Sequence, residues 1–350
     1  MSKGALAGLL VCGLMVGAAN GALSFNPAPG YTATPIWSGA DASHFAVDDG
    51  DVFVYGATEV GGGQYRNEVR WYDGVSTVTI ASSDPYTGTQ FSPDAIAVVN
   101  GAVYWAHAAS FVSGGAATLY KTTYDGVDWN TSAVFTGSAS INVFSLSTDG
   151  HRVFGVGLDA GGDNVAFYLD DNDTYQVFAA LPEYSGGSGF DPQGNFYAGA
   201  VDSSFTAHMY AFSASQVADR INGTQVTPYG IENAVDDLLV PGNGSPVMEG
   251  DGSLLYGVDY NGSFTGTDPF AIDVDTGDSW SLGKLSGAST AVTTDMYARD
   301  GDVYFMAKDA WGSGSEALIY RLVPEPASVM MLAAGMTVLL TRRRREEAGC

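Results

Sequence analysis

Cysteine is nearly absent from this sequence of 350 residues. Cys12 lies inside an apolar N-terminal run and Cys350 is the last residue, so the body between the two ends contains none. This excludes a disulfide framework, a thiolate metal site and a cysteine nucleophile in the body. A body of about 300 residues can bury enough apolar surface to fold without disulfide bonds.

Positive charge is also scarce. Lys and Arg supply 14 residues against 39 Asp and Glu, and the formal net charge is −25. Such a charge repels nucleic acid and anionic lipid surfaces, so we expect no nucleic-acid partner. The aspartates are spread along the chain, often beside glycine, as is typical of turns. Together with 46 glycines and many β-branched and aromatic residues, this predicts an all-β protein of short strands.

Recognised catalytic motifs are missing as well. The four histidines have no metal-ligand spacing, and the sequence has no Gly-x-Ser-x-Gly, His-Glu-x-x-His or phosphate-binding loop. We therefore assign no catalytic residue, no metal ligand and no cofactor. Two oxygen-rich segments, residues 170–173 and 273–278, leave calcium as an alternative, but both fall at expected hairpin turns and neither has the twelve-residue calcium loop. Enzyme activity stays open, because a glycosidase needs only two facing carboxylates.

One sequence motif recurs along the body. It consists of an alternating apolar run, a turn with glycine, and a second run rich in Tyr, Phe and Val. The glycines of its six copies lie about 50 residues apart. They are Gly50, Gly101, Gly150, Gly194, Gly252 and Gly301. Asp-Gly and Asn-Gly supply the positive φ angles of tight hairpins, and a second hairpin follows most copies. Four strands per repeat predict a β-propeller of six blades over residues 31–322.

Two irregularities bear on the number of blades. The sixth repeat ends one strand short, after residues 318–322. Residues 34–38 precede the first copy of the motif and belong to no other repeat. We therefore expect them to complete the last blade and close the ring. The fourth repeat is irregular around residues 213–237, where we expect an insertion or a short helix. A seventh, degenerate blade is the alternative.

Residues 1–22 have the three parts of a secretory signal peptide. Lys3 lies near the start, an apolar run covers residues 5–19, and the small residues Ala19, Gly21 and Ala22 follow. We expect cleavage after Gly21 or Ala22 and export of the body.

The C-terminus, residues 323–345, holds three features in order. They are Pro324-Glu325-Pro326, an apolar stretch over residues 329–340, and the cluster Arg342, Arg343, Arg344 and Arg345. The 12 residues of this apolar stretch span about 18 Å as a helix, short of the ~30 Å hydrocarbon core, so this predicts a short, temporary membrane helix. The arginines should stay cytoplasmic by the positive-inside rule, which leaves the body outside that membrane.

This arrangement resembles the PEP-CTERM sorting signal of proteins handled by exosortases, membrane enzymes of exopolysaccharide-producing bacteria. The resemblance covers about the last 25 residues. It implies that an exosortase-type processing enzyme recognises Pro324, Glu325 and Pro326. It also implies a transient inner-membrane anchor, followed by release of the body to the outer surface or extracellular matrix. A single-pass anchor that is kept is the alternative.

Candidate binding residues lie in the loops after the second strand of each blade, on the rim opposite the Asp-Gly turns. They are Tyr65, Phe111, Phe205, Phe264, Trp311, Asp159, Asp202, Asp259 and Asp309. Aromatic rings can stack on sugar rings while carboxylates accept hydrogen bonds from hydroxyl groups, which indicates a glycan ligand. The alternative is structural: the rings plug gaps between blades and the aspartates form turns.

Two functions compete. The first is an exported, non-catalytic envelope or matrix protein that binds exopolysaccharide or another surface component. The second is a secreted enzyme that cleaves or modifies glycans on the same scaffold. An enzyme should bring polar, pKa-perturbed groups together in the central channel. The fold alone does not decide, because propellers host both kinds of function.

Overall fold

The computed structural model describes residues 23–87, 96–107, 118–135, 142–159, 161–182, 184–204, 206–239, 248–251, 253–258, 268–286, 291–299, 302–309 and 315–325. The expected signal peptide, the apolar tail and the arginine cluster lie outside these ranges. Within these ranges, no helix is long and apolar enough to cross a membrane.

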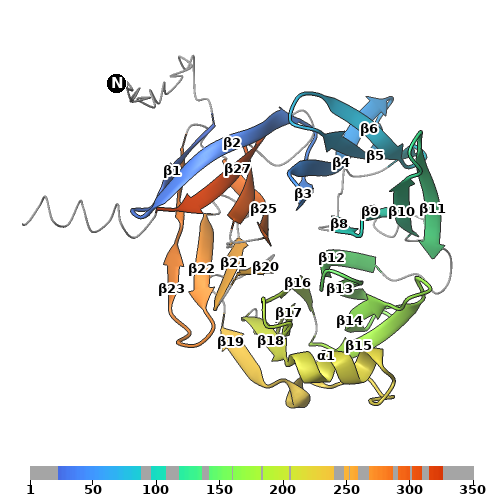
Figure 1. The fold of residues 1–350 in the computed structure, drawn as a ribbon, viewed down its shortest axis with the longest axis vertical. Helices are drawn as coiled ribbons and strands as arrows, with labels where there is room; N and C mark the ends of the chain where they lie inside the picture. The colour runs from blue at the N-terminus through green and yellow to red at the C-terminus, as the bar shows by residue number, and fades with distance from the viewer. Residues whose placement is uncertain are drawn as a thin grey trace, which may run out of the picture.

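Six antiparallel sheets stand around a central axis, so the chain folds as a six-bladed β-propeller (Figure 1). The strands of blades 1 to 3, from the axis outward, are β3 (His44–Asp48), β4 (Asp51–Gly61), β5 (Gln64–Tyr72) and β6 (Thr77–Ser82); β8 (Ile96–Val99), β9 (Ala102–His107), β10 (Thr118–Tyr124) and β11 (Trp129–Phe135); and β12 (Asn142–Thr148), β13 (Val153–Leu158), β14 (Asn164–Leu169) and β15 (Tyr175–Ala180). A short strand, β7 (Tyr86–Thr87), also pairs with β5.

The second half of the ring repeats this plan. Blades 4 to 6 contain β16 (Tyr184–Phe190), β17 (Phe196–Val201), β18 (Ala207–Phe212) and β19 (Asp236–Leu239); β20 (Met248–Asp251), β21 (Leu254–Val258), β22 (Pro269–Asp273) and β23 (Ser279–Ser281); and β25 (Val292–Arg299), β26 (Asp302–Lys308), β27 (Glu316–Pro324) and β2 (Tyr31–Ala40). The first strands of successive blades contact one another around the whole ring. The recurring sequence motif therefore forms the inner hairpin of each blade, as predicted.

Tight turns join the inner strands on one rim of the ring. The φ angles are 49° and 88° at Asp49-Gly50, and 51° and 74° at Asn100-Gly101. Two successive positive φ angles are the geometry that Asx-Gly pairs favour in hairpins, which confirms the role predicted for these glycines. Because the strands are antiparallel, the turn between the third and fourth strands of a blade lies on this same rim. We call it the turn rim and the opposite one the loop rim.

The N-terminal strand closes the ring, as the sequence predicted. β2 pairs antiparallel with β27 along its length, and Trp37, opposite Ile319, is only 5% exposed. A further strand, β1 (Ser24–Pro27), pairs with β24 (Gly283–Ser286). Phe25 of β1 packs 4.4 Å from Phe305, measured between ring centroids. The first and last segments of the body are thus joined by both pairing and apolar burial.

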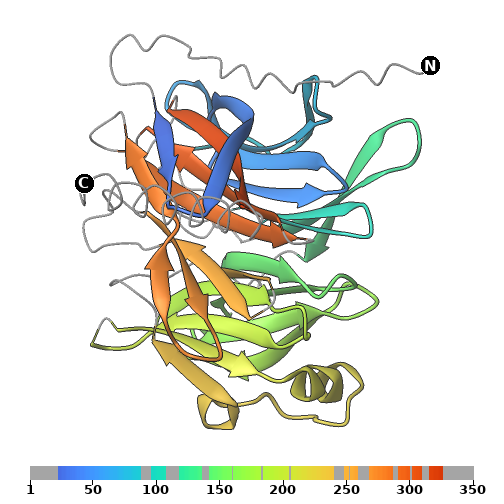
Figure 2. The ribbon, with the colours of Figure 1, turned by 60° about the vertical axis from the view of Figure 1, so that its left-hand side comes forward.

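The irregular fourth repeat contains an insertion, not a seventh blade. Between β18 and β19 the chain forms α1 (Ala214–Ile221) and the 3-10 turn η2 (Ile231–Asn233). Ser213 begins α1 with a capping box, in which its backbone N–H donates to Gln216 Oε1 at 2.9 Å. Both views place α1 at the periphery of the ring (Figures 1 and 2).

The insertion is attached to the neighbouring blade 3. Tyr229 forms an isolated parallel bridge with Ala179 at the outer edge of β15. The buried Arg220 donates from its guanidinium to the carbonyls of Val177, Gln225 and Val226. The insertion therefore covers an edge strand that would otherwise expose unpaired backbone groups.

Candidate functional site

The sequence-predicted residues do not form one site in the described part of the chain. Tyr65, Asp159, Asp202 and Asp309 belong to blades 1, 3, 4 and 6 or to the turns that follow their strands. The other predicted residues lie outside the described residues. These are Phe111, Phe205, Phe264, Trp311 and Asp259.

Tyr65 lies in a strand, where the sequence predicted a flexible loop. Residues 61–63 are three glycines with positive φ, and they close the hairpin so tightly that β5 already begins at Gln64. Tyr65 pairs with Glu59 and Tyr86, and its ring centroid lies 6.3 Å from that of Tyr86. Its ring therefore contributes to packing within blade 1.

Asp159 and Asp202 both have the structural role that the sequence left as an alternative. Asp159 Oδ1 accepts from the backbone N–H of Gly161 at 2.7 Å and of Asp163 at 3.0 Å. Asp202 Oδ1 accepts in the same way from Ser204 and Thr206. The hydrogen bond from Thr206 is the main cause that lowers the pKa of Asp202. Such contacts are those of turn-forming aspartates.

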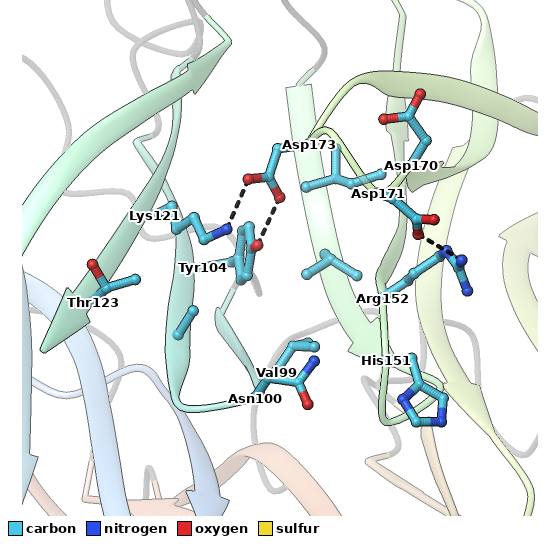
Figure 3. A pocket seen from close by; sticks show the side chains of 13 residues that line it. Val99, Asn100, Tyr104, Lys121, Thr123, His151, Arg152, Asp170, Asp171 and Asp173 are labelled. Carbon is cyan, nitrogen blue, oxygen red and sulfur yellow. Dashed lines mark hydrogen bonds and ion pairs between the residues drawn. The ribbon is translucent and has the colours of Figure 1, made fainter. Parts of the chain in front are cut away.

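A polar pocket instead opens on the turn rim, between blades 2 and 3 (Figure 3). Its volume is about 360 Å³. Blade 2 supplies the turn at Asn100 and side chains of β9 and β10, and blade 3 supplies both of its turns. The charged and hydrogen-bonding residues at the pocket are Asn100, Tyr104, Lys121, Thr123, His151, Arg152, Asp170, Asp171 and Asp173.

Lys121, Tyr104 and Asp173 join the two blades across the pocket. Lys121 Nζ lies 2.8 Å from Asp173 Oδ2, and the Tyr104 hydroxyl donates to Asp173 Oδ1 at 2.7 Å. Lys121 Nζ also lies 5.2 Å from the centroid of the Tyr104 ring. Burial would lower the pKa of Lys121, but its hydrogen bonds to Asp173 and Tyr104 outweigh burial and raise it. Lys121 is therefore a cation held in place at the pocket wall.

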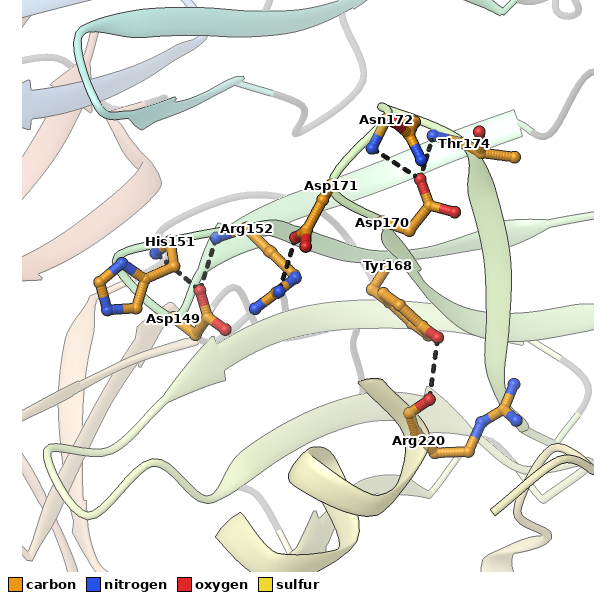
Figure 4. A network of polar contacts seen from close by, with 9 residues as sticks. All are labelled: Asp149, His151, Arg152, Tyr168, Asp170, Asp171, Asn172, Thr174 and Arg220. Carbon is orange, nitrogen blue, oxygen red and sulfur yellow. Dashed lines mark hydrogen bonds and ion pairs between the residues drawn. The ribbon is translucent and has the colours of Figure 1, made fainter. Parts of the chain in front are cut away.

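Arg152 is the second ordered cation. Its guanidinium lies 2.5 Å from Asp171 Oδ1. Asp149 fixes the turn that carries it, because Asp149 Oδ1 accepts from the backbone N–H of both His151 and Arg152 (Figure 4). Tyr168 donates its hydroxyl hydrogen to the Arg220 carbonyl at 3.1 Å, which attaches the same blade to the blade 4 insertion. The pocket wall is therefore built on supported turns.

The oxygen-rich segment at residues 170–173 does not converge on one point. Asp170 accepts from the backbone N–H of Asn172 and Thr174, Asp171 contacts Arg152, and Asp173 contacts Lys121. Burial would raise the pKa of Asp170, but the N–H donors of Thr174 and Asn172 outweigh it and lower the pKa. Among the described residues, no group of three or more His, Cys, Asp or Glu is placed to hold a metal ion.

A second pocket occupies the equivalent position between blades 4 and 5, with a volume of about 410 Å³. Tyr197 stands where Tyr104 stands in blade 2, three residues after the glycine of the repeat. Its hydroxyl donates to Asp191 of its own blade at 3.1 Å. Burial, followed by the nearby Asp191, raises the pKa of Tyr197. Among the described residues that line this pocket none is Lys, Arg or His, so its described lining differs in charge from that of the first.

The sequence did not single out Lys121, Arg152 and Tyr104, and the loops predicted to bind lie on the loop rim, opposite this pocket. One signal was available. Basic residues are scarce in the body, and residues 170–173 are rich in carboxylates that could pair with them. Whether these basic and acidic residues meet depends on how neighbouring blades pack. A sequence pattern within one repeat does not contain that information.

Comparison with known proteins supports the fold alone. No known family matches the sequence, and no curated protein is similar to it. Similar structures include TolB from Acinetobacter baumannii, with 12% identity over 77% of this chain and 63% of that chain and a TM-score of 0.47. A luciferin-regenerating enzyme matches with 10% identity over 84% and 95% of the two chains and a TM-score of 0.51. SapL1 lectin in complex with alpha methyl fucoside matches with 15% identity over 80% and 94%, and a TM-score of 0.46.

The class of protein is therefore a six-bladed β-propeller with a polar pocket between two blades. The chain spans 63% of the TolB length. The likeness to the luciferin-regenerating enzyme, at 10% identity and a TM-score of 0.51, shows the fold alone. Function has to be argued from the residues of the pocket.

Proposed function

We propose that this protein is an exported, non-catalytic propeller of the bacterial envelope or extracellular matrix that binds exopolysaccharide or another surface component. The pocket between blades 2 and 3 carries the binding part of the proposal. It is concave and places several polar groups on supported turns, as small-ligand sites commonly do. The binding site then lies on the turn rim and not in the loops predicted from the sequence.

The polar groups of this pocket suit sugar hydroxyls, which donate and accept hydrogen bonds. Asp170, Asp171 and Asp173 offer acceptor oxygens, while Lys121 and Arg152 offer N–H donors. A carboxylate on an acidic sugar would find a charge-assisted partner in either cation. Both cations are already paired with aspartate, so a ligand would exchange hydrogen bonds without first ordering these side chains.

Binding is favoured over glycan cleavage by the state of the carboxylates. A glycosidase needs a carboxylic acid whose pKa is raised, so that it is protonated near neutral pH. The pKa of Asp170 is lowered by its turn contacts, and Asp171 and Asp173 face cations. Asp170 is therefore suited to accept hydrogen bonds and not to act as a general acid.

The proposed localisation rests on the N-terminus that resembles a signal peptide and on the resemblance of the C-terminus to a PEP-CTERM tail. The proposed partners are an exosortase-type enzyme and, transiently, the inner membrane. Pro324 is the last residue of β27 and pairs with Tyr31, and the Glu325 N–H donates to the Gly30 carbonyl at 2.7 Å. Residues 30–31 and 324–325 therefore lie side by side, and the proposed recognition element would overlap the end of the last strand.

The binding proposal is tested by incubating the purified protein with the exopolysaccharide of the producing bacterium. We expect retention on immobilised polysaccharide without new reducing ends. Lys121→Ala combined with Arg152→Ala should abolish retention, whereas Lys284→Ala, an exposed lysine on β24, should not. New reducing ends would establish the enzymatic alternative, and absence of retention would refute binding.

The sorting proposal is tested by replacing Pro324, Glu325 and Pro326 with alanine while the apolar tail is kept. We expect unprocessed protein in the inner membrane, because the processing enzyme loses its recognition element. Val323→Ala is the neighbouring control. Export of the triple variant at normal size would show that the PEP-CTERM interpretation is wrong.

A further inference from the structure

A second feature of the turn rim is a cluster of partly exposed aromatic rings between blades 1 and 2. Trp71 of β5, Tyr124 of β10 and Trp129 of β11 form this cluster, which we call the aromatic platform. The ring centroid of Trp129 lies 5.9 Å from that of Trp71 and 5.2 Å from that of Tyr124. The outer strands β6 and β11 lie next to each other at this boundary (Figure 1).

The platform is more exposed than rings that only fill the space between blades. Trp105, at the same boundary but closer to the axis, has no exposed surface, whereas Tyr124 is 53% exposed and both tryptophans are half-buried. Phe53 lies beneath Trp129, with ring centroids 6.3 Å apart and an edge-to-face geometry. The tryptophans are thus held from below while Tyr124 extends the surface outward.

The two hairpin tips beside the platform are polar and well supported. Asp73 Oδ1 accepts from the N–H of Val75 and Ser76, and Asp125 Oδ1 accepts from that of Val127 and Asp128. Asp125 Oδ2 also accepts from the Asn130 amide at 2.9 Å. Flat apolar rings bordered by fixed carboxylate and amide groups match a sugar ring, which has an apolar face and hydroxyls around its edge.

The platform and the polar pocket occupy the two faces of one hairpin. Successive residues of a strand point to opposite faces of the sheet, so Tyr124 faces the platform and Thr123 faces the pocket. Their strand partners follow the same rule, with Trp129 opposite Tyr124 and Asn130 opposite Thr123. An extended ligand that crosses the tip at residues 125–128 would contact both faces.

Charge argues against a second copy of this chain as the occupant. Two copies, each with a formal net charge of −25, would have to bring their carboxylate-rich hairpin tips together. A neutral or weakly charged sugar chain avoids this repulsion.

We infer that the aromatic platform is a stacking subsite for the sugar rings of an extended polysaccharide, which continues across the tip of blade 2 into the pocket. This inference rests on the proposed function and names a ligand class, a polysaccharide with exposed apolar sugar faces. The side chain that carries the stacking contact with least involvement in folding is Tyr124.

The test uses affinity electrophoresis of the full chain in native gels. The gels are cast with hydroxyethyl cellulose, mixed-linkage β-glucan, galactomannan or alginate. We expect retardation in at least one gel, and a loss of about three- to tenfold in the association constant for Tyr124→Ala. Tyr124→Phe keeps the ring and should bind as the wild type does. Trp280→Ala is the matched control, because Trp280 is a 36% exposed ring on the outer strand of blade 5.

The outcomes separate this inference from the proposed function. If the paired Lys121 and Arg152 substitutions abolish retardation but Tyr124→Ala has no effect, the platform inference fails and the pocket stands. If Tyr124→Ala weakens binding and the pocket substitutions do not, the platform stands and the pocket assignment fails. No retardation of the wild type by any polysaccharide overturns both. A change from dimer to monomer in Tyr124→Ala, with binding unchanged, would make the platform a protein interface and overturn the inference.

Discussion

Blade 2 presents two different faces to its neighbours. Toward blade 1, the fully buried Trp105 stacks on Tyr120 with ring centroids 4.4 Å apart, and its Nε1–H donates to Thr122 at 2.9 Å. Toward blade 3, Tyr104 and Lys121 contact Asp173 across the polar pocket. Tyr104 and Trp105 are consecutive residues of β9, and alternation along the strand sends them to opposite faces.

Under the proposed function, this one sheet packs against blade 1 near the axis and contributes a ligand pocket toward blade 3. Apolar area removed from water contributes about 25 cal/mol per Å², so the face toward blade 1 should dominate stability. A partly exposed ion pair such as Lys121–Asp173 contributes about 0 to 1 kcal/mol, so the face toward blade 3 is available for recognition at little cost to folding. Stability and binding should therefore respond to different substitutions.

The largest effect is expected from removing β2, the strand that closes the ring. Deletion of residues 31–38 removes most of β2, exposes the edge of β27 and loses the burial of Ile36 and Trp37, each about 1.5–3 kcal/mol. We expect aggregation or a large fall in melting temperature, measured by calorimetry. An unchanged melting curve would show that ring closure does not hold the blades together.

The two faces of blade 2 are compared directly by Trp105→Ala and Lys121→Ala. We expect Trp105→Ala to lower the free energy of unfolding by about 3–5 kcal/mol, because it leaves a cavity between blades 1 and 2. Lys121→Ala should lower it by no more than about 1 kcal/mol. Urea denaturation followed by circular dichroism measures both. Equal losses would contradict this difference in stability between the apolar packing around Trp105 and the ion pair at the pocket.

The smallest expected effect is a pH dependence of stability that arises from His107, at the boundary of blades 1 and 2. His107 Nδ1 lies 2.7 Å from Asn67 Oδ1, and burial lowers the pKa of His107, with Asp84 opposing it. The unfolded chain therefore binds this proton at a higher pH than the folded protein does. Stability is complete above the unfolded pKa of about 6.5 and decreases as the pH falls below it.

This pH dependence is checked by unfolding at pH 7.5 and 5.5. His107→Gln should reduce the difference between the two pH values, because it removes the buried titrating group. His151→Gln is the matched control, since His151 is exposed on the turn rim. If the difference in unfolding free energy between the two pH values instead persists in His107→Gln and disappears in His151→Gln, His107 is not the group responsible.

Local pattern was sufficient for the blades. Asp49-Gly50 and Asn100-Gly101 adopt the positive φ angles that the pairs favour, and the alternating runs around them form the inner strands. These features could be predicted because each depends on residues within one hairpin. The closing strand could be predicted by counting strands in each repeat. The last repeat lacked one strand, and the residues before the first repeat supplied it.

The site could not be predicted in this way. Lys121 and Asp173 meet across two blades although 52 residues separate them, and the turn that supports Arg152 belongs to a different hairpin from the one that carries Asp171. Tyr65 shows the converse: three glycines before it indicated a loop, and the tertiary structure used them for a tight turn and continued the strand.

The sequence by itself determined the repeat, its inner hairpins and the strand that closes the ring, because alternation and turn chemistry act over a few residues. The tertiary structure decided that the irregular fourth repeat holds an insertion and not a seventh blade. Only the tertiary structure decided which rim carries the pocket and the platform. The side chains that form them come from neighbouring blades, and their positions depend on how one sheet packs against the next.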